Sequence, residues 1–243
     1  MAKKKIVYVQ EPPEGLFYIP SFLSAQEEKA LLDCIATEPF QPYDHHGYLA
    51  KREIVFYGSN GGYNGRDEDA ATPMPDWMKA LSARCAHLIG LANDELEMGL
   101  VAHYPVGAGI GWHRDAPQFG PTVIGVSFAS DAVMRFRRFV DAEEEMFRIN
   151  LQHGSAYIIS GSARSIWQHG MLPVKELRYS ITFRTIKKNA PTNDPRHDPV
   201  NIAKRLAALE INVRTEWPVA QPTRATGRQS ALKQLSLFEN GQK

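Results

Sequence analysis

The feature that most constrains the fold is a series of seven short strand-like segments between residues 97 and 186. Each segment has the apolar and β-branched content of a strand, and turn-forming residues separate it from the next. The segments are 97–104, 122–128, 133–139, 146–151, 156–160, 165–169 and 179–186. Such close spacing predicts an antiparallel sandwich or barrel, for which a jelly roll (double-stranded β-helix) is the natural candidate.

Two helices are expected before these strands, so the fold class is mainly β with flanking helices, an α+β arrangement. Ser24 followed by Glu27 has the pattern of a capping box, and apolar residues recur after it at helical spacing. A second helix is expected from Asp76. The only cysteines, Cys34 and Cys85, lie on the apolar faces of these helices, which predicts core positions and excludes a disulfide scaffold.

The segment between the two helices, at about residues 40–72, is rich in Gly, Asn, Asp and aromatic residues. A structureless loop of this length is unusual inside a domain, so we predict a lid. Residues 53–57 alternate like a strand, which predicts a hairpin-like flap that carries Tyr57 and Tyr63. The alternative is that both tyrosines only pack the lid.

The net charge of +1 conceals a basic tail. Residues 1–186 contain 18 Lys and Arg against 22 Asp and Glu, whereas residues 187–243 contain 10 against 5. We therefore predict a domain at 1–186 and a basic appendage at 187–243, with a short helix at 202–211 and flexible chain after about residue 218. The tail favours an electrostatic contact, for example with nucleic acid, although a solvated tail without a partner is the alternative.

No apolar stretch approaches the length that crosses a bilayer, and the chain starts with Lys3, Lys4 and Lys5 followed by mixed residues. We expect no membrane association. Sparse cysteines suit a reducing compartment. The expected location is therefore the cytoplasm.

Three residues have the identities of a metal site. His113 and Asp115 are separated by one residue, so an extended backbone places both side chains on one face, and His169 follows 56 positions after His113. Two histidines and one carboxylate form the facial triad of non-haem Fe(II), which leaves coordination positions open. The alternative for the short motif alone is a pair of surface polar residues.

The strand at 178–184 carries two arginines. Alternation places Arg178, Ser180 and Arg184 on one face, with Tyr179, Ile181 and Phe183 on the other. Two arginines inside a small barrel are costly without an anionic partner, and a dicarboxylate is such a partner. The alternative is an edge strand whose polar face is in water.

These motifs together resemble the AlkB family of 2-oxoglutarate- and Fe(II)-dependent dioxygenases, in particular its bacterial nucleic acid demethylases. The resemblance rests on YPVGAGIGWHRD at 104–115, on His169 and on RYSITFR at 178–184, and it extends to the segments at 15–24 and 52–58. It covers about residues 12–187. It implies a demethylase that flips an alkylated base into its pocket and hydroxylates the N-methyl carbon, after which formaldehyde leaves.

The resemblance also assigns roles to residues. His113, Asp115 and His169 would bind Fe(II); Tyr104 and Arg178, with Ser180 beside them, would bind the distal carboxylate of 2-oxoglutarate; and Arg184 would lie near its iron-bound end. The other reactant would be O2, with ascorbate as the reductant in vitro. Candidate substrate residues are Arg52, Tyr57, Tyr63, Arg135 and Arg137.

Two positions depart from the family pattern. Ala102 stands where many members have an asparagine, which removes a hydrogen bond to the cosubstrate. Pro117 stands where some DNA-repair members have an acidic residue that reads the base. Arg135 and Arg137 share one side of their strand, which suits phosphate contacts or a solvated face equally well.

The tail contains a second motif. Gln234, Leu235, Leu237 and Phe238 form QLSLF within a basic polar run. This pentapeptide resembles the bacterial sliding-clamp-binding motif, in which a Leu-Phe pair fills an apolar pocket. The alternative is a turn that docks back on the domain.

The leading functional prediction is demethylation of alkylated bases in DNA, and the clamp motif favours DNA over RNA. The runner-up is the same chemistry on RNA such as tRNA. Two further alternatives are a metal-free or zinc-loaded jelly-roll binding module and a hydroxylase of proteins or small molecules. We expect a monomer.

Overall fold

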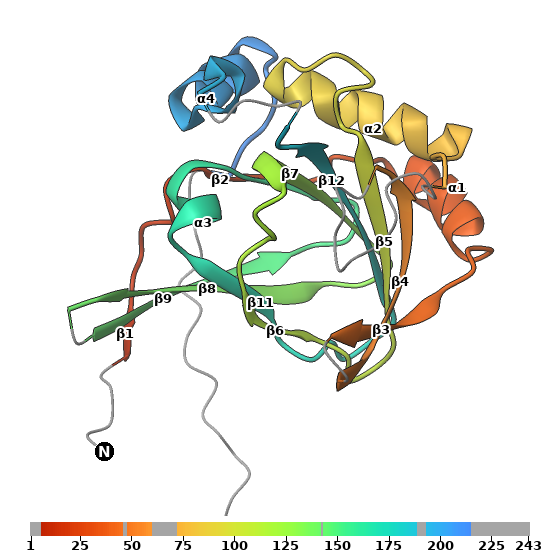
Figure 1. Ribbon diagram of the computed structural model, residues 1–243, viewed down its shortest axis with the longest axis horizontal. Coiled ribbons are helices and arrows are strands. Elements are labelled where there is room, and N and C mark those ends of the chain that lie inside the picture. The colour runs from red at the N-terminus through yellow and green to blue at the C-terminus, as the bar shows by residue number, and fades with distance from the viewer. Residues whose placement is uncertain (1–5, 46–47, 60–71, 142, 189–192, 215–243) are drawn as a thin grey trace, which may run out of the picture.

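The structure, a computed structural model, describes residues 6–45, 48–59, 72–141, 143–188 and 193–214. In this part of the chain two β-sheets pack face to face, and helices cover the outer face of the larger sheet (Figure 1). This is the predicted jelly roll. The strand and helix order therefore confirms the mainly β fold class with flanking helices.

The larger sheet has seven strands in the order β2-β10-β7-β12-β5-β4-β3. Its strands are β2 (Leu16–Ile19), β3 (Gln41–His45), β4 (Tyr48–Gly58), β5 (Met98–Tyr104), β7 (Phe119–Phe128), β10 (Ala156–Ile159) and β12 (Arg178–Ile186). The smaller sheet has five strands in the order β1-β9-β8-β11-β6. Its strands are β1 (Ile6–Tyr8), β6 (Ile110–His113), β8 (Ala132–Val140), β9 (Glu143–Leu151) and β11 (Gln168–Met171).

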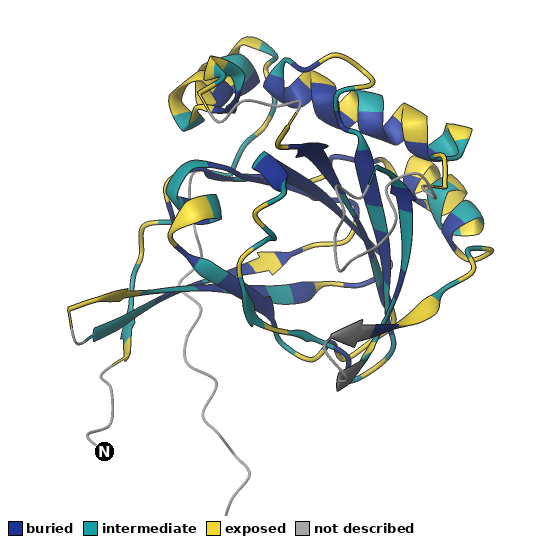
Figure 2. Ribbon diagram, viewed as in Figure 1, coloured by how far each residue is buried: buried dark blue, intermediate teal, exposed yellow. Residues whose placement is uncertain are grey.

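The hydrophobic core forms two layers, one on each face of the larger sheet. The outer layer joins that sheet to the helices through residues such as Ile181, Phe183, Leu81 and Cys85. The inner layer fills the space between the two sheets, and its aromatic members include Tyr18, Tyr104, Phe136, Phe147 and Trp167. Figure 2 shows the buried residues concentrated on the strands of the larger sheet and on the helix faces that meet it.

The first two helices begin where the sequence predicts. Helix α1 (Ala25–Ile35) starts at Ser24, and both hydrogen bonds of the capping box with Glu27 are present. Helix α2 (Asp76–Ile89) ends at Gly90, whose φ of 77° is the left-handed conformation that favours glycine. Cys85 is buried as predicted, whereas Cys34 is only partly buried. None of the helices in the described ranges is long and apolar enough to span a membrane.

The predicted flap is a β-hairpin at the edge of the larger sheet. Strands β3 and β4 pair antiparallel, and β4 continues the sheet by pairing with β5. The hairpin is therefore part of the sandwich. Tyr63 and the rest of the predicted lid between residues 60 and 71 lie outside the described residues.

Two predictions in the strand-rich region need correction. The segment predicted as a strand at 165–169 begins in a short helix, α3 (Gly161–Ser165), because Ile166 N–H and the Ser165 hydroxyl bond back to residues 162 and 161; β11 starts only at Gln168. Strand β6 was not predicted, because its segment is rich in glycine.

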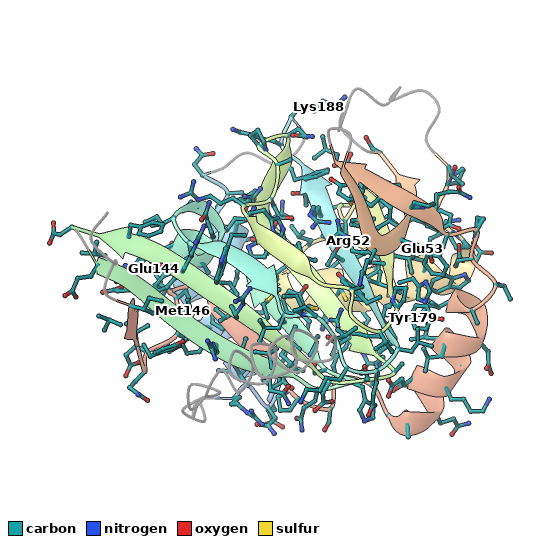
Figure 3. The ribbon with its side chains drawn as sticks, turned by 90° about the horizontal axis from the view of Figure 1, so that it is seen from below. Arg52, Glu53, Glu144, Met146, Tyr179 and Lys188 are labelled. Atoms are coloured by element: carbon teal, nitrogen blue, oxygen red, sulfur yellow. The ribbon has the colours of Figure 1, made fainter. Side chains whose placement is uncertain are left out.

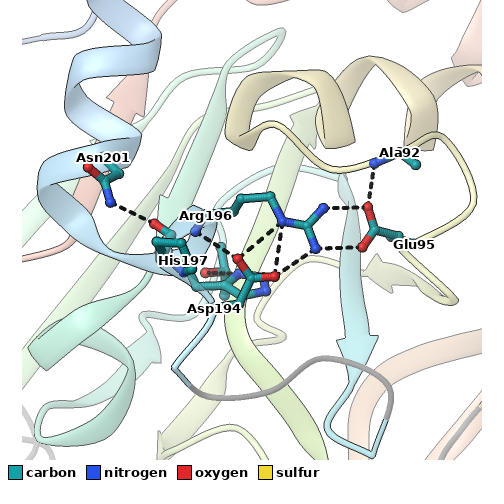
Figure 4. A network of polar contacts seen from close by, with 8 residues as sticks. Ala92, Glu95, Asp194, Arg196, His197 and Asn201 are labelled. Carbon is teal, nitrogen blue, oxygen red and sulfur yellow. Dashed lines mark hydrogen bonds and ion pairs between the residues drawn. The ribbon is translucent and has the colours of Figure 1, made fainter.

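Residues 193–214 of the predicted appendage pack on the domain. They contain a 3-10 turn, η2 (Pro195–His197), and helix α4 (Pro199–Ala208), which lies three residues earlier than predicted. Ile202 and Leu206 are buried in the same core as α2. Figure 4 shows a second link: Arg196 donates two hydrogen bonds to Glu95, at 2.7 and 2.8 Å, and also binds Asp194. The boundary at residue 186 stays a prediction.

Candidate active site

The three predicted metal residues lie together at one end of the smaller sheet. His113 ends β6 and faces His169 of β11 as its direct cross-strand partner, with ring centroids 4.3 Å apart. Asp115 follows two residues after His113, and its Oδ2 lies 3.5 Å from His169 Nε2. The strand pairing thus closes a separation of more than fifty residues in the sequence.

Asp115 is held from the opposite sheet. Its Oδ1 accepts hydrogen bonds from Arg184 Nε at 3.0 Å and from the terminal nitrogen Nη2 at 2.6 Å. Arg164 fixes the same loop by donating to the carbonyl oxygens of Asp115 and Ala116, both at 3.1 Å. The other carboxylate oxygen, Oδ2, is buried and has no hydrogen-bond partner among the described residues.

Burial and neighbouring charges keep the Asp115 carboxyl group and the His169 imidazole deprotonated near neutral pH. Burial alone would raise the pKa of Asp115, but the charge of Arg184, followed by His169 and Arg164, holds it well below its usual range. Burial, and then the neighbouring His113, lowers the pKa of His169 to about 3. A carboxylate and a neutral imidazole are the forms that bind a metal ion.

These observations fit a divalent metal ion held by His113, Asp115 and His169. The donor set is correct for Fe(II), and Asp115 Oδ2, which has no hydrogen bond among the described residues, lies 3.5 Å from His169 Nε2. Within the described ranges, no group of three His, Cys, Asp or Glu side chains has the geometry of a metal site. The structure thus brings the three side chains together without displaying a completed three-ligand geometry, and their role as ligands remains a prediction.

The predicted cosubstrate residues lie on the larger sheet. Arg178 begins β12 opposite Tyr104, the last residue of β5, and its guanidinium carbon lies 4.9 Å from the centre of the Tyr104 ring. One terminal nitrogen, Nη2, donates to Ser127 Oγ at 2.9 Å. Its Nε and Nη1 are buried and find no acceptor in the described part of the protein, although the side chain is fully buried.

A buried guanidinium with free donors is costly, and the two donors of Arg178 match the oxygens of a carboxylate. Tyr104 supports the same site. Burial would raise the pKa of its hydroxyl, but the charges of Arg52 and Arg178 and a hydrogen bond from Ser180 lower it. Ala102 lies opposite Ser180 and contributes no side-chain hydrogen bond. The pattern fits the far carboxylate of a dicarboxylic acid.

A cavity of about 740 Å³ opens onto two of the three predicted metal residues, His113 and Asp115. Its polar lining includes His113, Asp115 and Arg184, and Arg52 enters it from β4. Four aromatic lining residues, Tyr43, Phe56, Trp112 and Phe119, were not predicted. The Arg52 guanidinium lies 4.6 Å from the centre of the Tyr43 ring. The cavity therefore offers aromatic surface near the metal residues, as a flat ligand requires.

The predicted substrate role of Tyr57 needs correction. Tyr57 is only 8% exposed and belongs to the core layer beneath the helices, and its hydroxyl donates to the Glu38 carboxylate. Burial, and then this bond, raises the pKa of Tyr57. The alternation of β4 explains the correction, because Phe56 and Arg52 face the cavity while Tyr57 faces α1 and α2.

The remaining predicted residues lie elsewhere. Arg135 and Arg137 are on the outer face of the smaller sheet, where both lie against the ring of Trp112. The tail residues Gln234, Leu235, Leu237 and Phe238 are outside the described ranges, as is Tyr63. Pro117 lines a separate cavity of about 650 Å³.

Comparison with known proteins gives a family match. Residues 15–184 match the family model described as the 2OG-Fe(II) oxygenase superfamily. The chain is 28% identical over 178 residues to the Probable RNA/DNA demethylase ALKBH6 of Danio rerio, an alignment that covers 69% of this chain and 74% of that protein. It is 25% identical to the tRNA (carboxymethyluridine(34)-5-O)-methyltransferase alkbh8 of Xenopus tropicalis, covering 67% of this chain but only 26% of that protein.

Solved structures give a matching fold. OsALKBH1 superposes with a TM-score of 0.51 at 17% identity, covering 72% of this chain and 100% of that chain. A prolyl-4-hydroxylase from Pseudomonas putida superposes with a TM-score of 0.52 at 16% identity, covering 71% of this chain and 93% of that chain. At these identities the likeness shows the fold alone.

Proposed function

Because the chain belongs to the 2OG-Fe(II) oxygenase superfamily and is an AlkB-like member of it, we propose that it oxidatively demethylates N-alkylated bases, with DNA as its main substrate. The protein is a dioxygenase, and its cofactors are Fe(II), 2-oxoglutarate and O2. The observation that carries the proposal is the single cavity shared by His113, Asp115, Arg184 and the aromatic side chains of Tyr43 and Phe56.

Metal binding is assigned to residues on or next to the smaller sheet, and cosubstrate binding to residues of the larger sheet. Asp115 and the two histidines would hold Fe(II), and Arg184 keeps the Asp115 carboxylate oriented and charged. Arg178, with Tyr104, would bind the far carboxylate of 2-oxoglutarate. When bound, Fe(II) would activate O2, the oxidant: one oxygen atom would enter succinate as 2-oxoglutarate loses CO2, and the other would hydroxylate the N-methyl carbon, whose adduct releases formaldehyde from the base.

An extended cavity with aromatic walls suits a base that has left its stack. Tyr43 and Phe56 are placed to contact a flat ring, and Arg52 lies between Tyr43 and Tyr104. Demethylation of an RNA base is the second candidate, because the relatives named above include a Probable RNA/DNA demethylase and a tRNA methyltransferase. The metal-free or zinc-loaded binding module is excluded by the family match.

The proposal is tested by reconstituting the protein anaerobically with Fe(II) and 2-oxoglutarate. The protein is then incubated in air, with ascorbate as reductant, with methylated single-stranded DNA, duplex DNA or RNA. We expect formaldehyde release that requires 2-oxoglutarate and is fastest on DNA. Faster release from RNA would favour the second candidate. No release from any of the three, with metal binding intact, would remove the demethylase proposal while the oxygenase assignment stands.

We further propose that the tail binds the bacterial sliding clamp through Gln234, Leu235, Leu237 and Phe238. The five-residue pattern and the basic charge of the tail support this proposal. A tether raises the concentration of the enzyme near its substrate. In a titration of the full chain with purified clamp, we expect saturable binding that is lost in a Leu237→Ala, Phe238→Ala variant and kept in a Ser236→Ala control. Equal binding by both variants would rule the motif out.

We also propose that the protein acts in the cytoplasm as a monomer. The low cysteine content supports the location. Light scattering on a size-exclusion column measures the mass directly, and a mass of two chains would contradict the monomer.

A further inference from the structure

The outer face of the smaller sheet carries a cluster of arginines that the active site does not use. Met134 and Phe136 of β8 point into the core between the sheets, so Arg135 and Arg137 point to the other side. Arg148 of β9 shares that side, because its neighbours Phe147 and Ile149 are core residues. Helices α1, α2 and α4 lie on the far side of the molecule, next to the larger sheet (Figure 1).

The arginines of this cluster are unfavourably close. Arg135 and Arg148 are direct cross-strand partners, so two like charges face each other across β8 and β9. Burial, and then Arg148, lowers the pKa of Arg135. The Nε atoms of both side chains are buried without a hydrogen-bond partner in the described part of the chain. An anion placed between the two arginines would relieve this repulsion.

Aromatic rings hold the guanidinium groups in place. Arg135 and Arg137 lie 4.5 and 4.6 Å from the centre of the Trp112 ring, and Arg148 lies 4.8 Å from the centre of the Tyr8 ring. Contacts with a ring face leave the N–H edges of a guanidinium available to acceptors. Arg148 already donates from Nη2 to the Tyr8 hydroxyl at 2.7 Å, whereas Arg135 Nε has no hydrogen-bond partner among the described residues.

An acidic residue marks one end of the cluster. Arg137 meets Glu144 at 3.4 Å and Gln168 at 2.9 Å. Figure 3 shows Glu144 and Met146 on the strand β9 at the side of the molecule away from Arg52. Trp112, whose ring Arg135 and Arg137 both contact, also lines the cavity together with Arg114, so the cluster adjoins the cavity.

We propose that Arg135, Arg148 and Trp112 bind the sugar–phosphate backbone of the single strand whose base enters the cavity. This inference rests on the proposed function, since it names the path of that substrate. Guanidinium groups bind phosphates through paired hydrogen bonds, and an aromatic surface accepts sugars and bases without regard to sequence. The substrate class is therefore single-stranded nucleic acid that extends past the flipped base along the smaller sheet.

The test measures binding of a short fluorescent single strand to the full chain by anisotropy at several salt concentrations. Arg135→Gln removes a charged group whose Nε has no hydrogen-bond partner among the described residues. We expect its affinity to fall about tenfold and its salt dependence, as the slope of log K against log salt, to fall by about 0.7. Lys79→Gln, which removes an exposed charge on α2 on the opposite side, is the matched control and should bind like wild type.

Two further measurements separate a binding role from a structural one. The melting temperature of Arg135→Gln should equal or exceed that of wild type, because repulsion from Arg148 is removed, and Arg135→Lys should recover most of the lost affinity. A lower melting temperature with no recovery by lysine would assign Arg135 a structural role. Polyglutamate of the same charge should displace the fluorescent strand less well than an unlabelled strand does. Equal displacement by the two would overturn the assignment to nucleic acid.

The binding assay needs no iron, so its failure is distinguishable from failure of the proposed function. If wild type releases formaldehyde from methylated strands but Arg135→Gln binds as tightly as Lys79→Gln, the backbone path is wrong and the demethylase stands. If binding depends on Arg135 but no methylated strand is turned over, the surface stands and the demethylase fails. Absence of any binding by wild type overturns the surface directly.

Discussion

Replacing Asp115 with alanine should abolish high-affinity metal binding and lower turnover by more than about 100-fold, because even outer-shell contacts to metal ligands cost about 10- to 100-fold. The substitution removes a buried carboxylate whose pKa is held low by Arg184, followed by His169 and Arg164. It also leaves the Arg184 guanidinium without its bond at 2.6 Å. Anaerobic titration with Fe(II) measures the binding, and formaldehyde or succinate production measures the turnover.

A matched control separates loss of the ligand from loss of a charge. Asp33→Ala removes an exposed carboxylate on α1, where Asp33 pairs with Lys29. This variant should bind Fe(II) like wild type. If Asp115→Ala binds Fe(II) with unchanged affinity, Asp115 is not a ligand and the metal site must be placed elsewhere.

Replacing Arg178 with methionine should remove the cosubstrate site while leaving the fold intact. Loss of one partner of a buried charge pair costs about 2–5 kcal/mol, which corresponds to a weakening of 2-oxoglutarate binding by about 30-fold to several thousand-fold. Methionine fills similar apolar space beside Tyr104 and introduces no charge. In the absence of cosubstrate, the variant should be no less stable than wild type, because Arg178 Nε and Nη1 have no acceptor among the described residues.

The measurement is the melting temperature at increasing concentrations of 2-oxoglutarate, in the presence of a divalent metal ion that does not support catalysis. Wild type should gain stability with cosubstrate concentration, and Arg178→Met should not. Arg205→Met on α4, which removes an arginine bonded to the His87 carbonyl, should keep the wild-type response. An equal rise for Arg178→Met and wild type would show that the carboxylate binds elsewhere.

Much of the fold was predictable because the signals are local. The capping box at Ser24 and Glu27 and the alternation of β12 both act within a few residues, and both are present as predicted. Strand β6 gave no such signal, because it has only four residues, one of them Gly111, and it follows the glycine-rich segment with Gly107 and Gly109. It exists because β11 pairs with it, and that pairing is long-range.

The candidate site shows the same limit. The identities of His113, Asp115 and His169 were available from the sequence, but the contacts that tune them were not. Arg164 supports the Asp115 loop from α3, and no spacing in the sequence connects the two positions. The sequence predicts Tyr57 at the substrate site, but the phase of the β4 alternation relative to the cavity depends on pairing with β5. One residue of phase moves a side chain from the cavity to the opposite face.

The bond between Arg184 and Asp115 joins the two halves of the sandwich, since Arg184 belongs to the larger sheet and Asp115 follows a strand of the smaller one. Separation of the sheets would break this bond and would part the metal-binding residues from the cosubstrate-binding residues at the same time. Partial opening of the sandwich therefore cannot keep one of these two binding sites intact. Occupancy of the site is linked to the cooperative opening of the whole sandwich, so bound cofactors should slow amide hydrogen exchange in strands of both sheets together.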